Sequence, residues 1–122
     1  MSEMDKRKHS MRTWYGRFAK IVIDRPLGGV HPKHKKIIYG RNYGYIEGVL
    51  GGDGEEQDVY ILDVDTPIES CCAKIIGAIY RLNDEEDKLL AVVGDKKYTA
   101  EEIKEMLAFQ EKFFVTEIEL DK

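Results

Sequence analysis

Short apolar runs, each ended by turn-forming residues, constrain this 122-residue chain more than any other feature. Val59–Val64 (VYILDV), Lys74–Leu82 (KIIGAIYRL) and Leu89–Val93 (LLAVV) are rich in β-branched and aromatic residues. Thr13–Ile23 has the same character. Runs of this length and composition predict strands. The second and third are joined by Asn83–Lys88 (NDEEDK), so we expect them to pair as a hairpin.

One clear helix is predicted to begin at Thr99. Thr99 and Glu102 have the spacing of a capping box, in which each side chain binds a backbone N–H of the other residue. Ile103 and Leu107 then recur near the helical period and form an apolar face. A last strand is predicted at 115–120. Several short strands and one late helix indicate a small closed or strongly twisted β-sheet with a helix against it.

The composition predicts one globular domain, with 43% hydrophobic and 34% charged residues. Residues 1–12 resemble a flexible basic arm, which leaves 13–122 as the folded domain. No apolar run approaches the roughly 20 residues that span a membrane, and the N-terminus lacks a signal peptide's apolar segment. The two cysteines, Cys71 and Cys72, are adjacent, and neighbouring cysteines rarely form a disulfide. We therefore expect a cytoplasmic protein.

The net charge of −4 conceals two halves of opposite sign. Residues 1–41 carry eleven Lys/Arg against three Asp/Glu, a balance of +8, whereas residues 42–122 carry eight against twenty, a balance of −12. The charges could be ordinary solvated surface. They could also build a site that needs both signs, such as a metal–phosphate site, or a basic face for nucleic acid.

Two acidic clusters lie next to the predicted strands. The first, within GGDGEEQD at 51–58, precedes the strand at Val59, and the second is the hairpin loop NDEEDK. Taken alone, an acidic cluster of either kind is more often a solvent-exposed turn than a binding site. If the strands are neighbours, however, the carboxylates gather at one mouth of the sheet, where their repulsion favours a bound cation. Oxygen ligands suit Mg²⁺, which takes one or two carboxylates and keeps waters for substrate phosphates.

The order of these motifs resembles the soluble, Mg-dependent inorganic pyrophosphatases. In that family NYGYI, here at 42–46, is followed at this spacing by an Asp-Gly-Asp-Pro-x-Asp motif and an apolar strand. The likeness continues through the second acidic loop and the strand after it, covering residues 39–93. It implies a mainly β (α+β) fold, a small OB-like closed β-barrel with a C-terminal helix packed on it.

The resemblance also implies the roles of individual residues, and Mg²⁺, two or more ions, as the cofactor. The implied metal ligands are Asp53, Asp58, Asp84 and Asp87. The implied substrate-binding residues are Lys20, Lys88, Tyr39, Arg25 and Lys33. The implied catalytic residues are Glu55 and Tyr43.

Several positions depart from the family pattern. Glu55 stands where the family has the aspartate that positions or deprotonates the attacking water, and it is one methylene longer. Val22 replaces a metal-associated glutamate, and Phe113–Phe114 replaces a Tyr-Lys pair that reaches a phosphate. The basic loop around 31–36 (HPKHKK) is also shorter, so Arg25, Lys33 and Arg41 all remain candidates for the family's arginine.

The sequence therefore favours a Mg-dependent hydrolase of pyrophosphate or a related small phosphoanhydride, with no membrane partner and with homo-oligomerisation left open. The first alternative is a catalytically degenerate domain of the same fold that binds metal or phosphate. The second is an OB-like nucleic-acid-binding module in which tyrosines stack on bases. The acidic cluster beside those tyrosines would repel a polynucleotide, which argues against the second alternative.

Overall fold

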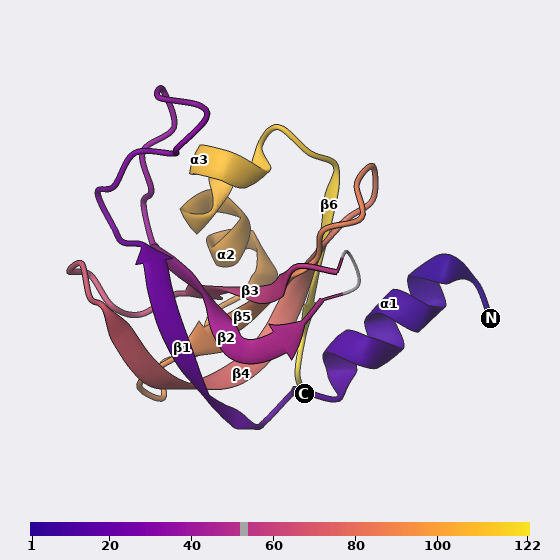
Figure 1. The fold of residues 1–122 in the computed structure, drawn as a ribbon. Helices are drawn as coiled ribbons and strands as arrows, with labels where there is room; N and C mark the ends of the chain where they lie inside the picture. The colour runs from indigo at the N-terminus through magenta and orange to yellow at the C-terminus, as the bar shows by residue number, and fades with distance from the viewer. Residues whose placement is uncertain (52–53) are drawn as a thin grey trace.

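The computed structural model describes residues 1–51 and 54–122, which form one sheet with helices around it (Figure 1). The helices are α1 (Glu3–Arg12), α2 (Ala100–Met106) and α3 (Ala108–Glu111). The strands are β1 (Phe18–Arg25), β2 (Asn42–Leu50), β3 (Glu56–Ile61), β4 (Ser70–Arg81), β5 (Lys88–Val92) and β6 (Thr116–Leu120). No helix in the described ranges has the length and apolar character needed to cross a membrane.

Five strands close into a barrel, and the sixth extends its longest strand. The order is β1-β2-β3-β5-β4-β6, and a further pairing of β1 with β4 completes the barrel. The first half of β4 pairs with β1, while its second half pairs with β6. The predicted β4–β5 hairpin is confirmed as antiparallel, and β3 pairs with β5 in parallel. The strand that follows the first acidic cluster is therefore a neighbour of the strand that follows the second.

Two apolar clusters hold the fold together, one inside the barrel and one between its outer face and the last helices. The inner cluster includes Ile21, Val59 and Leu89. In the outer cluster, Ile103 of α2 and Leu107, which follows this helix, pack against tyrosines and aliphatic residues of β2, β3 and β5. Burial of these apolar side chains is the main favourable term in folding. The predicted OB-like barrel with a C-terminal helix on it is confirmed.

The tyrosine-rich strand β2 was missed in the sequence, and its glycine explains how it fits. A Cβ atom at Gly44 would lie 1.9 Å from the carbonyl oxygen of Val22 on β1, so only glycine allows this approach. Gly77, where a close approach was predicted, would place a Cβ 2.3 Å from the carbonyl oxygen of Glu119. The two glycines let β1 and β6 pack tightly on their neighbours.

The predicted capping box of α2 is confirmed, because the Thr99 hydroxyl accepts from the Glu102 amide and the Glu102 carboxylate accepts from the Thr99 amide. The helix is shorter than the apolar pattern suggested. It ends at Met106 and is followed by the single turn α3, which carries Gln110 and Glu111 into the interior.

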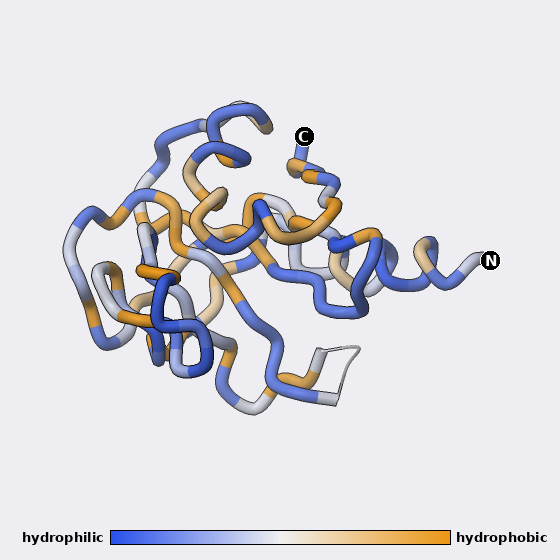
Figure 2. Tube along the Cα trace, turned by 90° about the horizontal axis from the view of Figure 1, so that it is seen from above, coloured by the Kyte–Doolittle hydropathy of each residue, from blue (hydrophilic) through white to orange (hydrophobic). Residues whose placement is uncertain are grey.

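Residues 1–12 differ from the predicted arm, because Glu3–Arg12 forms α1. Ser2 and Asp5 build a capping box at its start, and Met11 is buried against the inner cluster. Three basic residues of α1 bind acidic residues far along the chain, in the pairs Arg7–Asp87, Lys8–Glu117 and Arg12–Glu119. Figure 2 shows α1 as a mainly hydrophilic segment beside the barrel, which is why its contacts are largely ionic.

Arg7 fastens α1 to the second acidic loop. Its guanidinium donates two hydrogen bonds to Asp87, and others to the carbonyl oxygens of Arg81 (2.9 Å) and Asp84 (3.0 Å). The side chain of Asp87 is only 4% exposed, so Arg7 in place of water is its partner for hydrogen bonds. The loop that carries Asp84 and Glu86 is thus held from outside the barrel.

We expect Arg7→Ala to loosen this loop and to cost about 3 kcal/mol of unfolding free energy, because it leaves a buried carboxylate without its cation. Amide hydrogen exchange in residues 82–88 should quicken at the same time. Arg12→Ala is the matched control, since Arg12 is 53% exposed. Equal effects of the two substitutions on exchange in the loop would contradict the clamp.

Candidate active site

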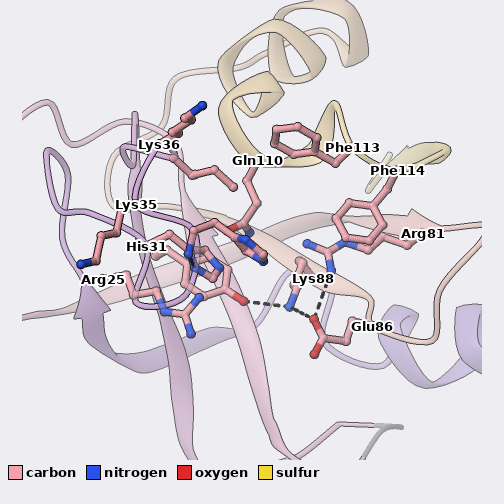
Figure 3. A pocket seen from close by; sticks show the side chains of 13 residues that line it. Arg25, His31, Lys35, Lys36, Arg81, Glu86, Lys88, Gln110, Phe113 and Phe114 are labelled. Atoms are coloured by element: carbon pink, nitrogen blue, oxygen red, sulfur yellow. Dashed lines mark hydrogen bonds and ion pairs between the residues drawn. The ribbon is translucent and has the colours of Figure 1, made fainter.

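A buried lysine joins the two acidic segments. Lys88 begins β5, its side chain is 2% exposed, and its ammonium donates to Asp58 (2.6 Å), Glu86 (2.8 Å) and the Tyr43 hydroxyl (2.8 Å). The parallel register of Val59 with Leu89 places Asp58 directly beside Lys88. Figure 3 shows the ammonium at the floor of a pocket, with Glu86 on one side. One cation is therefore shared between a carboxylate of β3 and a carboxylate of the loop between β4 and β5.

A second buried cation lies where β4 ends. Arg81 donates from its Nε and one terminal nitrogen to Glu111 of α3, at 3.0 and 2.7 Å. Its other terminal nitrogen reaches Glu86 at 3.1 Å and Asp84 at 3.4 Å. The ring of Phe114 covers the guanidinium at 3.8 Å, a cation–π contact. Arg81 thus holds α3 and the second acidic loop together at the pocket wall.

A buried hydrogen-bond chain links Arg81 to a third cation, Arg25 of β1. Arg25 donates to the Tyr39 hydroxyl (2.7 Å), and Tyr39 donates to the Gln110 side-chain oxygen (2.6 Å). The amide nitrogen of Gln110 donates to the Tyr60 hydroxyl (2.6 Å). The Tyr60 hydroxyl in turn donates to the Glu111 carboxylate that holds Arg81. The chain fixes two arginines, from β1 and β4, as parts of one wall.

The pocket between these walls has a volume of about 570 Å³. Its basic side is formed by Arg25 and by residues of the 31–36 loop, with His31 lying 4.9 Å from His34 between ring centres. Its floor is formed by Tyr43, Arg81, Glu86 and Lys88. Its remaining side is formed by Ile37, Gln110, Phe113 and Phe114. Cations outnumber carboxylates in this lining, so the pocket suits an anion.

The surroundings set the ionisation of three lining groups. Burial of Glu86 opposes its ionisation, but the hydrogen bond and charge of Lys88, with Arg81, outweigh it and lower its pKa. Burial, together with the nearby charge of Asp58, raises the pKa of Tyr43 well above its usual value. Burial and the neighbouring charge of Arg25 lower the pKa of His31. At neutral pH the pocket therefore holds an ionised Glu86, a neutral phenol and a neutral imidazole.

The structure brings together several of the residues implied by the sequence. Arg25, Tyr43 and Lys88 line the pocket, and Asp58 and Tyr39 contact them. Lys20 and Lys33 are exposed and are not among the lining residues. Glu55 is exposed in the turn before β3, and Asp53 lies outside the described residues.

The second acidic loop differs from the implied arrangement. Asp87 turns to Arg7, away from the pocket, and Glu86 takes the place beside Lys88. Residues 86 and 87 lie in the loop just before β5, and the contacts of their side chains show that these leave the loop in different directions. Asp84 contacts Arg81 at 3.4 Å and is 35% exposed. Glu86 is therefore the better-placed carboxylate of this loop.

The carboxylates beside the pocket are oxygen ligands of the type that a hard cation such as Mg²⁺ prefers, although Lys88 already pairs with two of them, Asp58 and Glu86. No group of three or more His, Cys, Asp or Glu that could hold a metal is found in residues 1–51 and 54–122. Mg²⁺ needs only one or two carboxylates, because waters and substrate oxygens complete its shell. Asp58 and Glu86 are 27% and 40% exposed, so a cation can reach both.

Glu86, Arg81, Gln110 and Glu111 were missed in the sequence. For Gln110 a signal existed, because it follows Ile103 and Leu107 on the same apolar helix face. A polar residue at such a position indicates a buried group with a partner. Arg81 is similar, since it ends the apolar run of β4 and is 4% exposed. Which residues they bind depends on the fold and has no local signal.

A protein-family model described as inorganic pyrophosphatase matches residues 2–120. The inorganic pyrophosphatase of Corynebacterium efficiens is 31% identical over 84 residues, which cover 65% of this chain and 49% of that protein. The soluble inorganic pyrophosphatase of Oryza sativa subsp. indica is 30% identical over 79 residues, which cover 62% of this chain and 34% of that protein. This chain spans about half the length of the bacterial relative and about a third of the rice one.

Solved structures resemble the fold over most of the chain. The inorganic pyrophosphatase of Ehrlichia chaffeensis matches with a TM-score of 0.67 and 17% identity, covering 84% of this chain and 85% of that one. The inorganic pyrophosphatase of Coxiella burnetii matches with a TM-score of 0.62 and 16% identity, covering 87% and 86%. At this sequence identity the structural likeness establishes the shared barrel fold alone, so the activity has to be argued from the residues of the site.

Proposed function

The chain belongs to the inorganic pyrophosphatase family, and we propose that it hydrolyses inorganic pyrophosphate or a closely related phosphoanhydride with the help of Mg²⁺. One observation carries the proposal. Lys88 joins Asp58 and Glu86 at the floor of a pocket whose opposite side is basic. A carboxylate for a cation, Glu86, and several cations for a phosphate thus line the same space, and Asp58 contacts this lining through Lys88. The family match supports this reading, while the chain's short length against its relatives leaves the activity a proposal.

The basic residues of the pocket would bind the substrate. Arg25 and Lys88 present fixed positive charge, because Tyr39 and Tyr43 hold their ends by hydrogen bonds. Charge-assisted bonds from such groups to phosphate oxygens are strong and directional. Tyr43 keeps its proton, since its pKa is raised, and so would act as a hydrogen-bond donor rather than a base.

Asp58 and Glu86 would hold the first Mg²⁺, and Asp53 and Asp84 are the further ligands that we propose for a second ion. A bound Mg²⁺ supplies charge neutralisation and a more acidic water. Glu55 remains our proposed residue for orienting the attacking water, in the turn that leads into β3. Lys20 and Lys33 remain proposed phosphate contacts. Because both side chains are exposed, their ammonium groups would have to turn toward the pocket to reach a phosphate.

A degenerate, non-hydrolytic domain is the second candidate, and the pocket lining favours it. Phe113 and Phe114 line the pocket in place of a hydroxyl and a cation, and phenyl rings do not bind phosphate oxygens. Arg81 offsets part of this loss, because Phe114 holds its guanidinium at the same wall.

Cys71 and Cys72 are both free thiols, in keeping with the predicted cytoplasmic location.

Phosphate release from pyrophosphate tests the proposal. We expect the purified protein to release phosphate in Mg²⁺ and to stop when the metal is chelated. If no phosphate is released but calorimetry shows Mg²⁺ binding, the degenerate domain is supported instead. If neither occurs and single-stranded nucleic acid binds with steep salt dependence, the nucleic-acid module is supported.

A further inference from the structure

The pocket has a part that a bare diphosphate ion would not use. Phe113 and Phe114 follow α3 and face the pocket across from Arg25 and His31 (Figure 3). Phenyl rings gain nothing from phosphate oxygens, yet Phe113 is 58% exposed at this edge. An exposed aromatic side chain on the rim of an anion pocket offers a flat apolar surface on which a ring of a charged ligand can stack.

The size of the pocket agrees with a larger ligand. Its volume of about 570 Å³ falls within the range of roughly 300–1,000 Å³ that drug-sized ligands and cofactors occupy. Pyrophosphate is much smaller than such molecules. Besides the cations Arg25, Lys88 and Arg81, which suit phosphates, the lining includes Phe113, which suits a second chemical group.

The two phenylalanines differ in what their rings contact. Phe114 lies over the Arg81 guanidinium at 3.8 Å and so is engaged within the protein. Phe113 lies 5.3 Å from the ammonium of Lys112 and still has most of its surface exposed. Phe113 is therefore the ring that a ligand can cover.

We propose that the pocket binds a nucleoside diphosphate, with the diphosphate among Arg25, Lys88 and Arg81 and the base stacked on Phe113. The inference rests on the proposed function for the diphosphate part, and goes beyond it in naming the organic group. A nucleobase fits because it stacks on a phenyl ring without a base-specific contact. Among the described residues that line the pocket, Ile37 is the one aliphatic side chain, whereas the cations are several, so the lining suits a charged ligand with a flat ring better than a long hydrocarbon chain.

The test compares two diphosphate esters by calorimetry in Mg²⁺, ADP, which carries a nucleoside, and methyl diphosphate, which carries a methyl group in its place. We expect ADP to bind about ten-fold more tightly to the wild type, the effect of one stacked base. Phe113→Ala should abolish this preference. Val115→Ala, at an equally exposed apolar residue two positions further on, should retain it. Because Phe113 is exposed, its replacement leaves the core intact, and a thermal melt of each variant confirms this.

Equal affinities for ADP and methyl diphosphate in the wild type would overturn the inference, as would a preference that survives Phe113→Ala. Tighter binding of geranyl diphosphate than of ADP would overturn it too, in favour of a hydrocarbon ligand. Phosphate release from pyrophosphate, recorded on the same samples, separates the two proposals. If the protein releases phosphate but binds ADP no more tightly than methyl diphosphate, only the nucleotide inference is wrong. If it prefers ADP through Phe113 but releases no phosphate, only the proposed hydrolysis is wrong.

Discussion

Lys88→Met is expected to lower the catalytic efficiency for pyrophosphate about 100-fold, on the scale of removing one fixed electrostatic contact to the reacting group. Among residues 1–51 and 54–122, the ammonium of Lys88 is the group that contacts Asp58, Glu86 and Tyr43 together. Its loss removes a cation from the substrate and leaves two carboxylates to repel each other. Methionine keeps the unbranched shape and most of the length of the side chain, so the change tests charge more than packing. Steady-state phosphate release is the measurement.

Lys74→Met is the control for this substitution, because Lys74 is exposed on β4 and away from the pocket lining. We expect it to keep wild-type activity. A Lys88→Met protein that works within about threefold of the wild type, a change small beside the loss of a fixed catalytic contact, would mean that the ammonium does not bind the substrate.

Glu111→Gln is expected to lower the free energy of unfolding by about 3 kcal/mol, and Tm by on the order of 10 °C. Glu111 is 4% exposed and accepts two hydrogen bonds from Arg81 and one from Tyr60. Loss of its charge leaves the buried guanidinium of Arg81 without its closest counter-charge. Thermal unfolding followed by circular dichroism measures the change.

Glu117→Gln removes an acidic group from a comparable ion pair at the surface, since Glu117 is 47% exposed and binds Lys8. An exposed pair contributes about 0–1 kcal/mol, so we expect little change in Tm. If both substitutions shift Tm equally, the Arg81–Glu111 pair does not hold α3 to the barrel.

The elements that the sequence predicted are those with local signals. The β4–β5 hairpin has two apolar runs around a polar loop, and α2 has a capping box, so each could be identified without its neighbours. β2 was missed because Gly44 and Gly48 interrupt its pattern, and its extended form depends on pairing with β1 and β3. α1 was missed although Ser2 and Asp5 carry a capping-box spacing, since ionic contacts distant in sequence hold that helix in place.

The site divides in the same way. A family resemblance placed Asp58 and Lys88 in one site, and the structure has them 2.6 Å apart. It implied Asp87 as a ligand, and the structure pairs Asp87 with Arg7 and brings Glu86, which the resemblance did not imply, to Lys88. Arg81 and Glu111 are thirty positions apart, and their pairing follows only from the packing of α3 on the barrel.

Asp58→Asn tests the central claim most directly, because the substitution keeps the shape of a side chain that contacts Lys88 and removes the charge proposed to hold Mg²⁺. Asp65→Asn is the matched control, since Asp65 is 82% exposed and pairs only with the surface residue Arg41 among its described ion pairs. We predict that the wild type and Asp65→Asn release phosphate from pyrophosphate in Mg²⁺. Asp58→Asn should be slower by a factor of about 100 or more. Equal rates for all three proteins would contradict a Mg-dependent pyrophosphatase site at Asp58.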